Sequence, residues 1–138
     1  MAALPTIEDL RALMASAPAD VSAVYVFGSV ARGTASSVSD LDLGILLRRR
    51  PASTLAGRML DYEAALERAL GRPVQAVVLN DAPPDLAHRV LRDGHLLLER
   101  DRSARLQFEV RTRNLYFDLL PLLIRYRTRA VARAAATS

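Results

Sequence analysis

The spacing of apolar residues along the chain predicts alternating helices and strands with short connections. Apolar runs flanked by turn-forming residues predict strands at residues 22–27, 40–47, 73–79 and 95–99. Apolar residues that recur every three or four positions predict helices at residues 5–16, 54–70, 83–94 and 102–135. The last helix contains Pro121, which predicts a break or a kink because proline lacks the backbone N–H that a helix interior needs. This order predicts a mixed sheet with helices packed against it, a fold of the α/β or α+β type.

Length and composition narrow the class of protein. The chain of 138 residues fits one domain over residues 1–138. It has no cysteine, which excludes disulfides and cysteine-ligated metal and fits a cytoplasmic protein. The N-terminus lacks the pattern of a signal peptide, and no apolar run approaches the roughly 20 residues that span a bilayer. We therefore expect no association with a membrane.

Basic residues are concentrated in the C-terminal segment. All 19 basic residues are arginine, and eight of them lie in residues 102–138, beside only Glu109 and Asp118 as acids. The same segment carries large apolar residues, including Phe117, Leu122 and Ile124. We expect residues 102–138 to form a basic helical segment, which is either a solvated helix face or a surface that docks a protein partner. A nucleic-acid partner is not expected.

Two carboxylates lie one residue apart in a strand that is otherwise apolar. Because alternate side chains of a strand share a face, Asp40, Asp42 and Gly44 are expected on one face, with the apolar residues between them in the core. Two ionised carboxylates on one face repel each other, and a divalent cation removes that repulsion. Oxygen ligands of this kind suit Mg²⁺, which takes one or two carboxylates together with substrate phosphates. The pattern therefore predicts a magnesium site at Asp40 and Asp42.

A Gly-Ser pair at the end of the preceding strand complements this metal site. Glycine lets a ligand approach the backbone closely, and free N–H groups at such a turn bind phosphate. Gly28 supplies the close approach, Ser29 adds a hydroxyl, and Arg32 adds a positive charge near the phosphates. Ten residues separate Ser29 from Asp40. The combination indicates a site for attack at phosphorus on a metal-bound triphosphate.

The stretch "FGSVARGTASSVSDLDLGILL" resembles the signature of the minimal nucleotidyltransferases, which have the polymerase-beta-like fold in its smallest form. The likeness is greatest to the MNT antitoxins of HEPN/MNT toxin–antitoxin modules, and it extends more weakly to "RPVQAVVLNDAP" and "FEVRTRNLYFDLLPLLIRY". The resemblance implies that Gly28, Ser29 and Arg32 bind ATP and that Asp40 and Asp42 bind Mg²⁺. It implies catalytic roles for Asp40, Asp42 and Ser29. It also implies transfer of AMP from ATP to a tyrosine of a partner HEPN ribonuclease, which silences that toxin.

The sequence departs from this family at one expected carboxylate. The family often has a third carboxylate on a later strand, and Gln75 stands at the matching place. Glutamine has a carbonyl oxygen but is no general base. Asp81 lies six residues further along, roughly 20 Å in an extended strand, and does not replace it. Other carboxylates of the chain are expected on a solvated helix face: Asp61, Glu63 and Glu67.

Three functions therefore remain open. The first is a Mg²⁺-dependent adenylyltransferase that modifies a cognate toxin, which the Gly-Ser and Asp-x-Asp elements favour. The second is an antitoxin that neutralises its toxin by binding alone, which Gln75 favours. The third is a nucleotidyltransferase acting on a small molecule.

Overall fold

The computed structural model describes residues 4–36, 39–48 and 53–136, with side chains from Met59 onward in the helix that begins at Ser53. Ser37, Val38 and residues 137–138, which the predicted loop and basic segment include, lie outside the described residues. Within the described part, four strands form one mixed sheet in the order β3-β2-β1-β4. They are β1 (Val21–Phe27), β2 (Leu41–Leu47), β3 (Val74–Val78) and β4 (His95–Glu99). β1 is antiparallel to β2 and β4, and β3 is parallel to β2.

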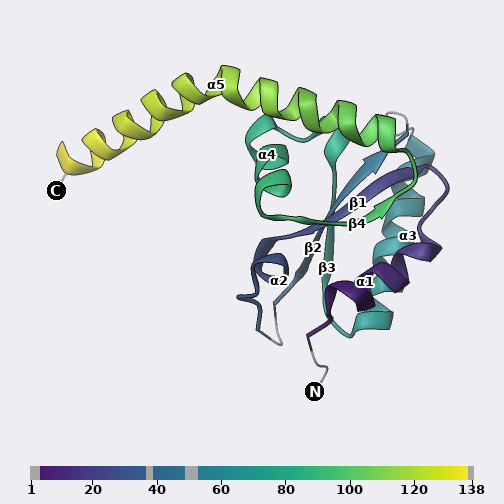
Figure 1. Ribbon diagram of the computed structural model, residues 1–138. Helices are drawn as coiled ribbons and strands as arrows, with labels where there is room; N and C mark the ends of the chain where they lie inside the picture. The colour runs from purple at the N-terminus through teal and green to yellow at the C-terminus, as the bar shows by residue number, and fades with distance from the viewer. Residues whose placement is uncertain (1–3, 37–38, 49–52, 137–138) are drawn as a thin grey trace.

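The helices lie on both faces of this sheet (Figure 1). They are α1 (Ile7–Leu13), α2 (Gly28–Arg32), α3 (Ser53–Leu70), α4 (Pro84–Asp93) and α5 (Arg102–Ala136), with short 3₁₀ turns at Met14–Ser16 and Leu79–Asp81. α1 begins with a capping box in which Thr6 and Asp9 each accept the other's backbone N–H. The predicted elements are present, with ends that differ from the prediction by at most three residues, and α2 was not among the predicted helices. β2 begins at Leu41, so that Asp40 precedes the strand. Within the described residues, no helix is long and apolar enough to cross a membrane.

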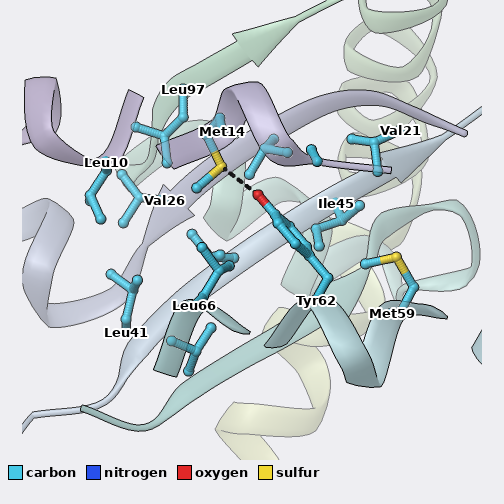
Figure 2. Packing of buried hydrophobic residues seen from close by; sticks show 14 of the residues in the cluster. Leu10, Met14, Val21, Val26, Leu41, Ile45, Met59, Tyr62, Leu66 and Leu97 are labelled. Atoms are coloured by element: carbon cyan, nitrogen blue, oxygen red, sulfur yellow. Dashed lines mark hydrogen bonds between the residues drawn. The ribbon is translucent and has the colours of Figure 1, made fainter. Parts of the chain in front are cut away.

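One face of the sheet packs against α1 and α3. Figure 2 shows this core, in which Val26 of β1 and Leu41 and Ile45 of β2 lie among residues of the two helices. The hydroxyl of Tyr62 donates a hydrogen bond to Sδ of Met14 at 3.4 Å, which satisfies the buried polar atom. Burial of these strand residues confirms the predicted inward face of β2.

The opposite face of the sheet is also covered, by α4 and the first half of α5. Tyr25, Leu46 and Val90 belong to this second core. A side chain at Gly44 would meet Leu79 and Val90 at 3.2 Å. The face that carries Gly44 is therefore buried along most of β2, and only its first residues reach the edge of the sheet. Burial on both faces explains why β1 and β2 have nearly continuous apolar sequences.

The free edge of β3 is closed by glutamates of α3. Glu67 Oε1 accepts the backbone N–H of Val74 at 3.0 Å, and Glu63 Oε1 accepts that of Ala76 at 2.8 Å. Asp61 and Glu67 are exposed, as predicted for a solvated helix face, whereas Glu63 is half-buried. The prediction did not include the second role of the two glutamates, which cap N–H groups that the parallel pairing with β2 leaves unused.

The helix α5 continues through Pro121 without a break. Figure 1 shows that its axis bends near the middle, which agrees with the predicted kink. Its first half is fixed to the sheet by the buried Phe108 and by a polar cluster. Tyr25 donates to Glu109 Oε1 at 2.9 Å, and Arg105 donates to Glu109 at 2.9 Å and to Glu99 at 3.0 Å.

Candidate functional site

The ends of three strands meet at one edge of the sheet, which here means the edge that the strand ends form and not the free side of β3. β1 ends at Phe27, whose register partner is Asp42 at the start of β2. Asp42 is in turn the register partner of Gln75 at the start of β3. Register partners lie about 4.8 Å apart with side chains on the same face. Because α2 starts directly after Phe27, the Gly-Ser pair lies at this same edge.

Gly28 and Asp42 are in direct contact. Gly28 has φ of 74°, a left-handed conformation that glycine adopts without strain. A methyl group on Gly28 would lie 3.2 Å from Cγ of Asp42 and still closer to its Oδ2. The carboxylate therefore occupies space that only a glycine leaves free. The turn predicted to bind phosphate and the carboxylate predicted to bind metal thus lie in contact.

The electrostatic environment of Asp42 disfavours its charge. Burial raises the pKa of Asp42, the negative charge of Asp40 raises it further, and the guanidinium of Arg32 lowers it. Asp40 and Arg32 are both exposed, and both act on the same half-buried carboxyl. The three residues that the sequence analysis named for metal and phosphate are thus close enough to interact. A cation bound here would offset the repulsion between the two carboxylates.

Two residues of α4 and β4 border the site, although nothing in the sequence pattern indicated them. His95 Nε2 donates a hydrogen bond to the backbone carbonyl of Ala31 at 3.2 Å, which ties β4 to α2. The pKa of Asp93 is lowered by its hydrogen bond from Arg92 and, among weaker contributions, by the charge of Arg32. Only the packing of α2 against α4 brings these groups to the edge of the sheet.

Gln75 occupies the place expected for a third carboxylate. It is exposed and pairs in register with Asp42 across the parallel β2–β3 ladder. Its match to the third carboxylate of the family stays a prediction. Among the described residues no group of three histidine, cysteine or carboxylate side chains is placed to hold a metal ion. The candidate metal ligands among the described residues at this edge are therefore the carboxylates of Asp40 and Asp42 and, beside them, the amide oxygen of Gln75.

Arg72 is a buried cation that sequence reasoning missed. Only 4% of the residue is exposed, and Nη1 donates to the carbonyl of Ser39 at 3.3 Å. Its Nε and Nη2 have no hydrogen-bond partner among the described residues. The carbonyl of the adjacent Pro73 accepts the N–H of Leu41 at 2.9 Å. Arg72 and Pro73 thereby hold the chain on both sides of Asp40, and the parallel register of β2 and β3 is the signal that would have placed them there.

Comparison with known proteins agrees with this geometry. The sequence model of the family described as polymerase beta nucleotidyltransferase matches residues 8–103. No curated protein matches the chain. The matched range contains all five residues predicted for the site and ends at the beginning of α5.

Solved structures extend the likeness over nearly the whole chain. The crystal structure of a toxin–antitoxin with AMP-PNP is similar with a TM-score of 0.69 and 22% identity, over 95% of this chain and 98% of that chain. The structure of a tri-AMPylated HEPN toxin of Shewanella oneidensis in complex with an MNT antitoxin contains a similar chain. The TM-score is 0.63 and the identity 19%, over 94% of this chain and 95% of that chain. The toxin–antitoxin MntA-HepT gives 0.62 and 20% identity, over 94% and 96%. At these identities the likeness shows the fold, which is that of the polymerase-beta-like nucleotidyltransferases.

Proposed function

This chain belongs to the polymerase beta nucleotidyltransferase family, and we propose that it is an antitoxin that transfers AMP from ATP to a tyrosine of a cognate HEPN ribonuclease toxin in the cytoplasm. The toxin–antitoxin complexes that share its fold support this proposal, since one of them contains an AMPylated HEPN toxin and another contains AMP-PNP. A protein acceptor is proposed because a complex that shares this fold contains a HEPN toxin that carries AMP.

The observation that carries the proposal is the contact between Gly28 and Asp42. In this contact the predicted phosphate-binding turn lies beside one of the two carboxylates that are proposed to hold a cation. In the proposed complex the backbone at Gly28 and Ser29 and the hydroxyl of Ser29 bind the phosphates of ATP. Arg32 neutralises part of their charge.

The donor set at this edge fits Mg²⁺. Asp40 and Asp42 would hold the ion, whose charge would offset the burial of Asp42 and the negative charge of Asp40, the two causes that raise the pKa of Asp42. When bound, Mg²⁺ screens the charge of the phosphates and orients the attacking and leaving oxygens. Two protein carboxylates leave further coordination positions to phosphate oxygens and water, as this ion prefers.

The proposed reaction is a substitution at the α-phosphorus of ATP. The tyrosine oxygen forms a bond to the α-phosphorus, the bond from that phosphorus to the bridging oxygen breaks, and pyrophosphate leaves with the bonding electrons. The hydroxyl proton passes to water or to a phosphate oxygen, because Gln75 does not accept protons at neutral pH. Positioning and charge stabilisation then supply the catalysis, and a general base supplies none of it.

A second function is favoured by Gln75 itself. A missing base typically reduces a rate by about 10²–10⁴-fold. The chain would then neutralise the toxin by binding, with ATP chemistry too slow to matter. Both functions require the same partner, and they differ in whether that partner becomes modified.

The test is co-expression with the product of the neighbouring gene, followed by mass spectrometry of that purified product. Transfer predicts mass increases in steps of one AMP, which disappear in Asp40→Ala/Asp42→Ala. The matched control, Asp61→Ala/Asp118→Ala, removes two exposed carboxylates elsewhere. This control is expected to show the same mass increases as the wild-type chain. An unmodified partner that is still bound and inhibited would support neutralisation by binding. A product of the neighbouring gene that this chain neither modifies nor binds would exclude both functions.

A further inference from the structure

The second half of α5 is mostly exposed in the part of the chain that the structure describes. The first half is fixed by the buried Phe108 and Thr112 and by a stacked pair, His88 on Tyr116, whose ring centroids are 3.6 Å apart. Beyond this pair the helix, coloured yellow-green to yellow in Figure 1, extends past the rest of the molecule. Its side chains from residue 124 to 136 are all exposed.

Five of the exposed apolar residues of α5 form a line along the helix, which we call the heptad stripe. They lie four, seven, seven and seven residues apart and are between 43% and 69% exposed: Leu106, Val110, Phe117, Ile124 and Val131. Seven residues correspond to nearly two turns of an α-helix, so these side chains point the same way, with a drift of about 20° for each step. A coiled coil uses two apolar positions in every seven residues, and the stripe supplies one of these two positions to a second helix.

Arginines border the heptad stripe. Arg113 and Arg127 follow Val110 and Ile124 by three residues each, so both lie on the same side of the stripe, about 21 Å apart along the helix axis. Arg125 lies on its other side. From residue 106 to 136 the chain carries six arginines and two acids, Glu109 and Asp118, and Glu109 lies 3.9 Å from Arg113. A helix that packs on the stripe therefore meets positive charge at both margins.

A second copy of this chain does not satisfy these charges. In a parallel pair of α5 helices, Arg113 would face its own counterpart, and Arg127 likewise. In an antiparallel pair centred on Leu120, Arg113 would face Arg127, because the two are equally distant from the centre. Both arrangements place like charges together, which opposes pairing.

A membrane surface does not match the helix either. A helix that lies on a bilayer has one apolar side and one polar side. In α5, large exposed apolar residues also lie on a side of the helix away from the stripe, at Leu115, Leu122 and Tyr126. A flat bilayer cannot cover both sides at once.

We propose that the heptad stripe of α5 docks an amphipathic helix of the acceptor protein, with acidic residues on that helix facing Arg113 and Arg127. The inference rests on the proposed function only for the identity of the protein that supplies the helix. Docking at the stripe raises the local concentration of the acceptor at the nucleotide site, which Asp40 and Asp42 alone do not do.

Calorimetric titration of the full chain with the purified HEPN protein, without nucleotide, tests the proposal. The variant Phe117→Ala/Ile124→Ala/Val131→Ala is expected to weaken binding by about 100-fold or more, because buried apolar anchors carry most of the affinity of an interface. The matched control, Leu115→Ala/Leu122→Ala/Tyr126→Ala, removes a similar exposed apolar area and is expected to change it by less than about threefold. Arg113→Glu/Arg127→Glu is expected to weaken binding, and added salt to weaken wild-type binding.

The outcomes separate this proposal from the proposed function. Equal losses in the stripe variant and its control, or no loss in either, would overturn the docking site. Wild-type chain that self-associates through the stripe, or that binds anionic vesicles through it, would overturn it as well. Asp40→Ala/Asp42→Ala is expected to bind with wild-type affinity, so failure of AMP transfer with intact binding counts against the enzyme alone. Transfer that persists in a stripe variant with unchanged affinity counts against the docking site alone. A HEPN protein that shows no binding to the wild-type chain overturns both.

Discussion

Replacing Gly28 by alanine tests whether the turn after β1 and the Asp42 carboxylate form one site. Gly28 and Gly33 both have φ of 74°. A methyl group at Gly33 would meet no atom within 4 Å, whereas one at Gly28 would meet the carboxylate of Asp42. Gly33→Ala is therefore a matched control that carries the backbone strain without the collision.

The expected loss follows from these two contributions. An alanine in the left-handed region costs about 1–2 kcal/mol, which both variants incur. Displacing the Asp42 carboxylate adds about 1–3 kcal/mol at Gly28 alone. Unfolding entropy of about 2.1 cal/mol/K per residue over 138 residues makes 1 kcal/mol equivalent to about 3.4 °C in Tm. We expect Tm to fall by about 3–7 °C in Gly33→Ala and by about 7–17 °C in Gly28→Ala.

Calorimetric melting of the two variants and of the double variant Gly28→Ala/Asp42→Ala measures the collision directly. Truncating Asp42 removes the obstructing carboxylate, so the double variant is expected to regain the excess loss. Gly28→Ala is also expected to abolish AMP transfer, while Gly33→Ala retains it. Equal Tm values for the two single variants, or a double variant in which the separate losses simply add, would refute the direct contact.

Three further predictions concern the same edge of the sheet. Gln75→Asp is expected to raise the rate of AMP transfer by up to about 10²–10⁴-fold. Gln75→Asn is the control, because asparagine has the shape of aspartate without its charge. Equal rates in the two variants would show that a carboxylate at residue 75 has no role. Because burial and Asp40 raise the pKa of Asp42 in the folded chain, its ionisation opposes folding; the stability present below pH about 3.8 is lost as pH rises through the folded pKa. Without divalent cations, Asp42→Asn is therefore expected to be more stable than the wild-type chain at pH 7, by about 0.6 kcal/mol for two charges roughly 6–7 Å apart in water. At pH 3 it is expected to be no more stable, and thermal melts at the two pH values measure the difference. Arg72→Met is expected to keep or raise Tm, because it removes a buried cation with two nitrogens that have no partner among the described residues. The Mg²⁺ concentration for half-maximal AMP transfer is expected to rise. A fall in Tm with an unchanged Mg²⁺ requirement would make Arg72 purely structural.

Local sequence determined the elements of this protein and the identity of its candidate ligands. The apolar periodicity of 22–27 and 40–47 suffices for two strands, because burial on one or both faces imposes a period that few other structures share. Thr6 and Asp9 suffice for the start of α1, since a capping box is completed within four residues. The Gly-Ser pair and Asp40 and Asp42 are recognisable for the same reason: their chemistry depends on spacing along a short stretch.

Tertiary structure alone decided what these elements touch. The sequence places Asp42 and Gly44 on one face, but only the packing of Leu79 and Val90 buries Gly44 and leaves the carboxylate at the edge. The glutamates of α3 cap β3 because a parallel pairing leaves N–H groups unused at that edge, and no local pattern encodes the pairing. Arg72 reaches the Asp40 segment across more than thirty residues of chain. Such contacts depend on strand order and register, which follow from the free energy of the whole core and cannot be read from the few residues that make the contact.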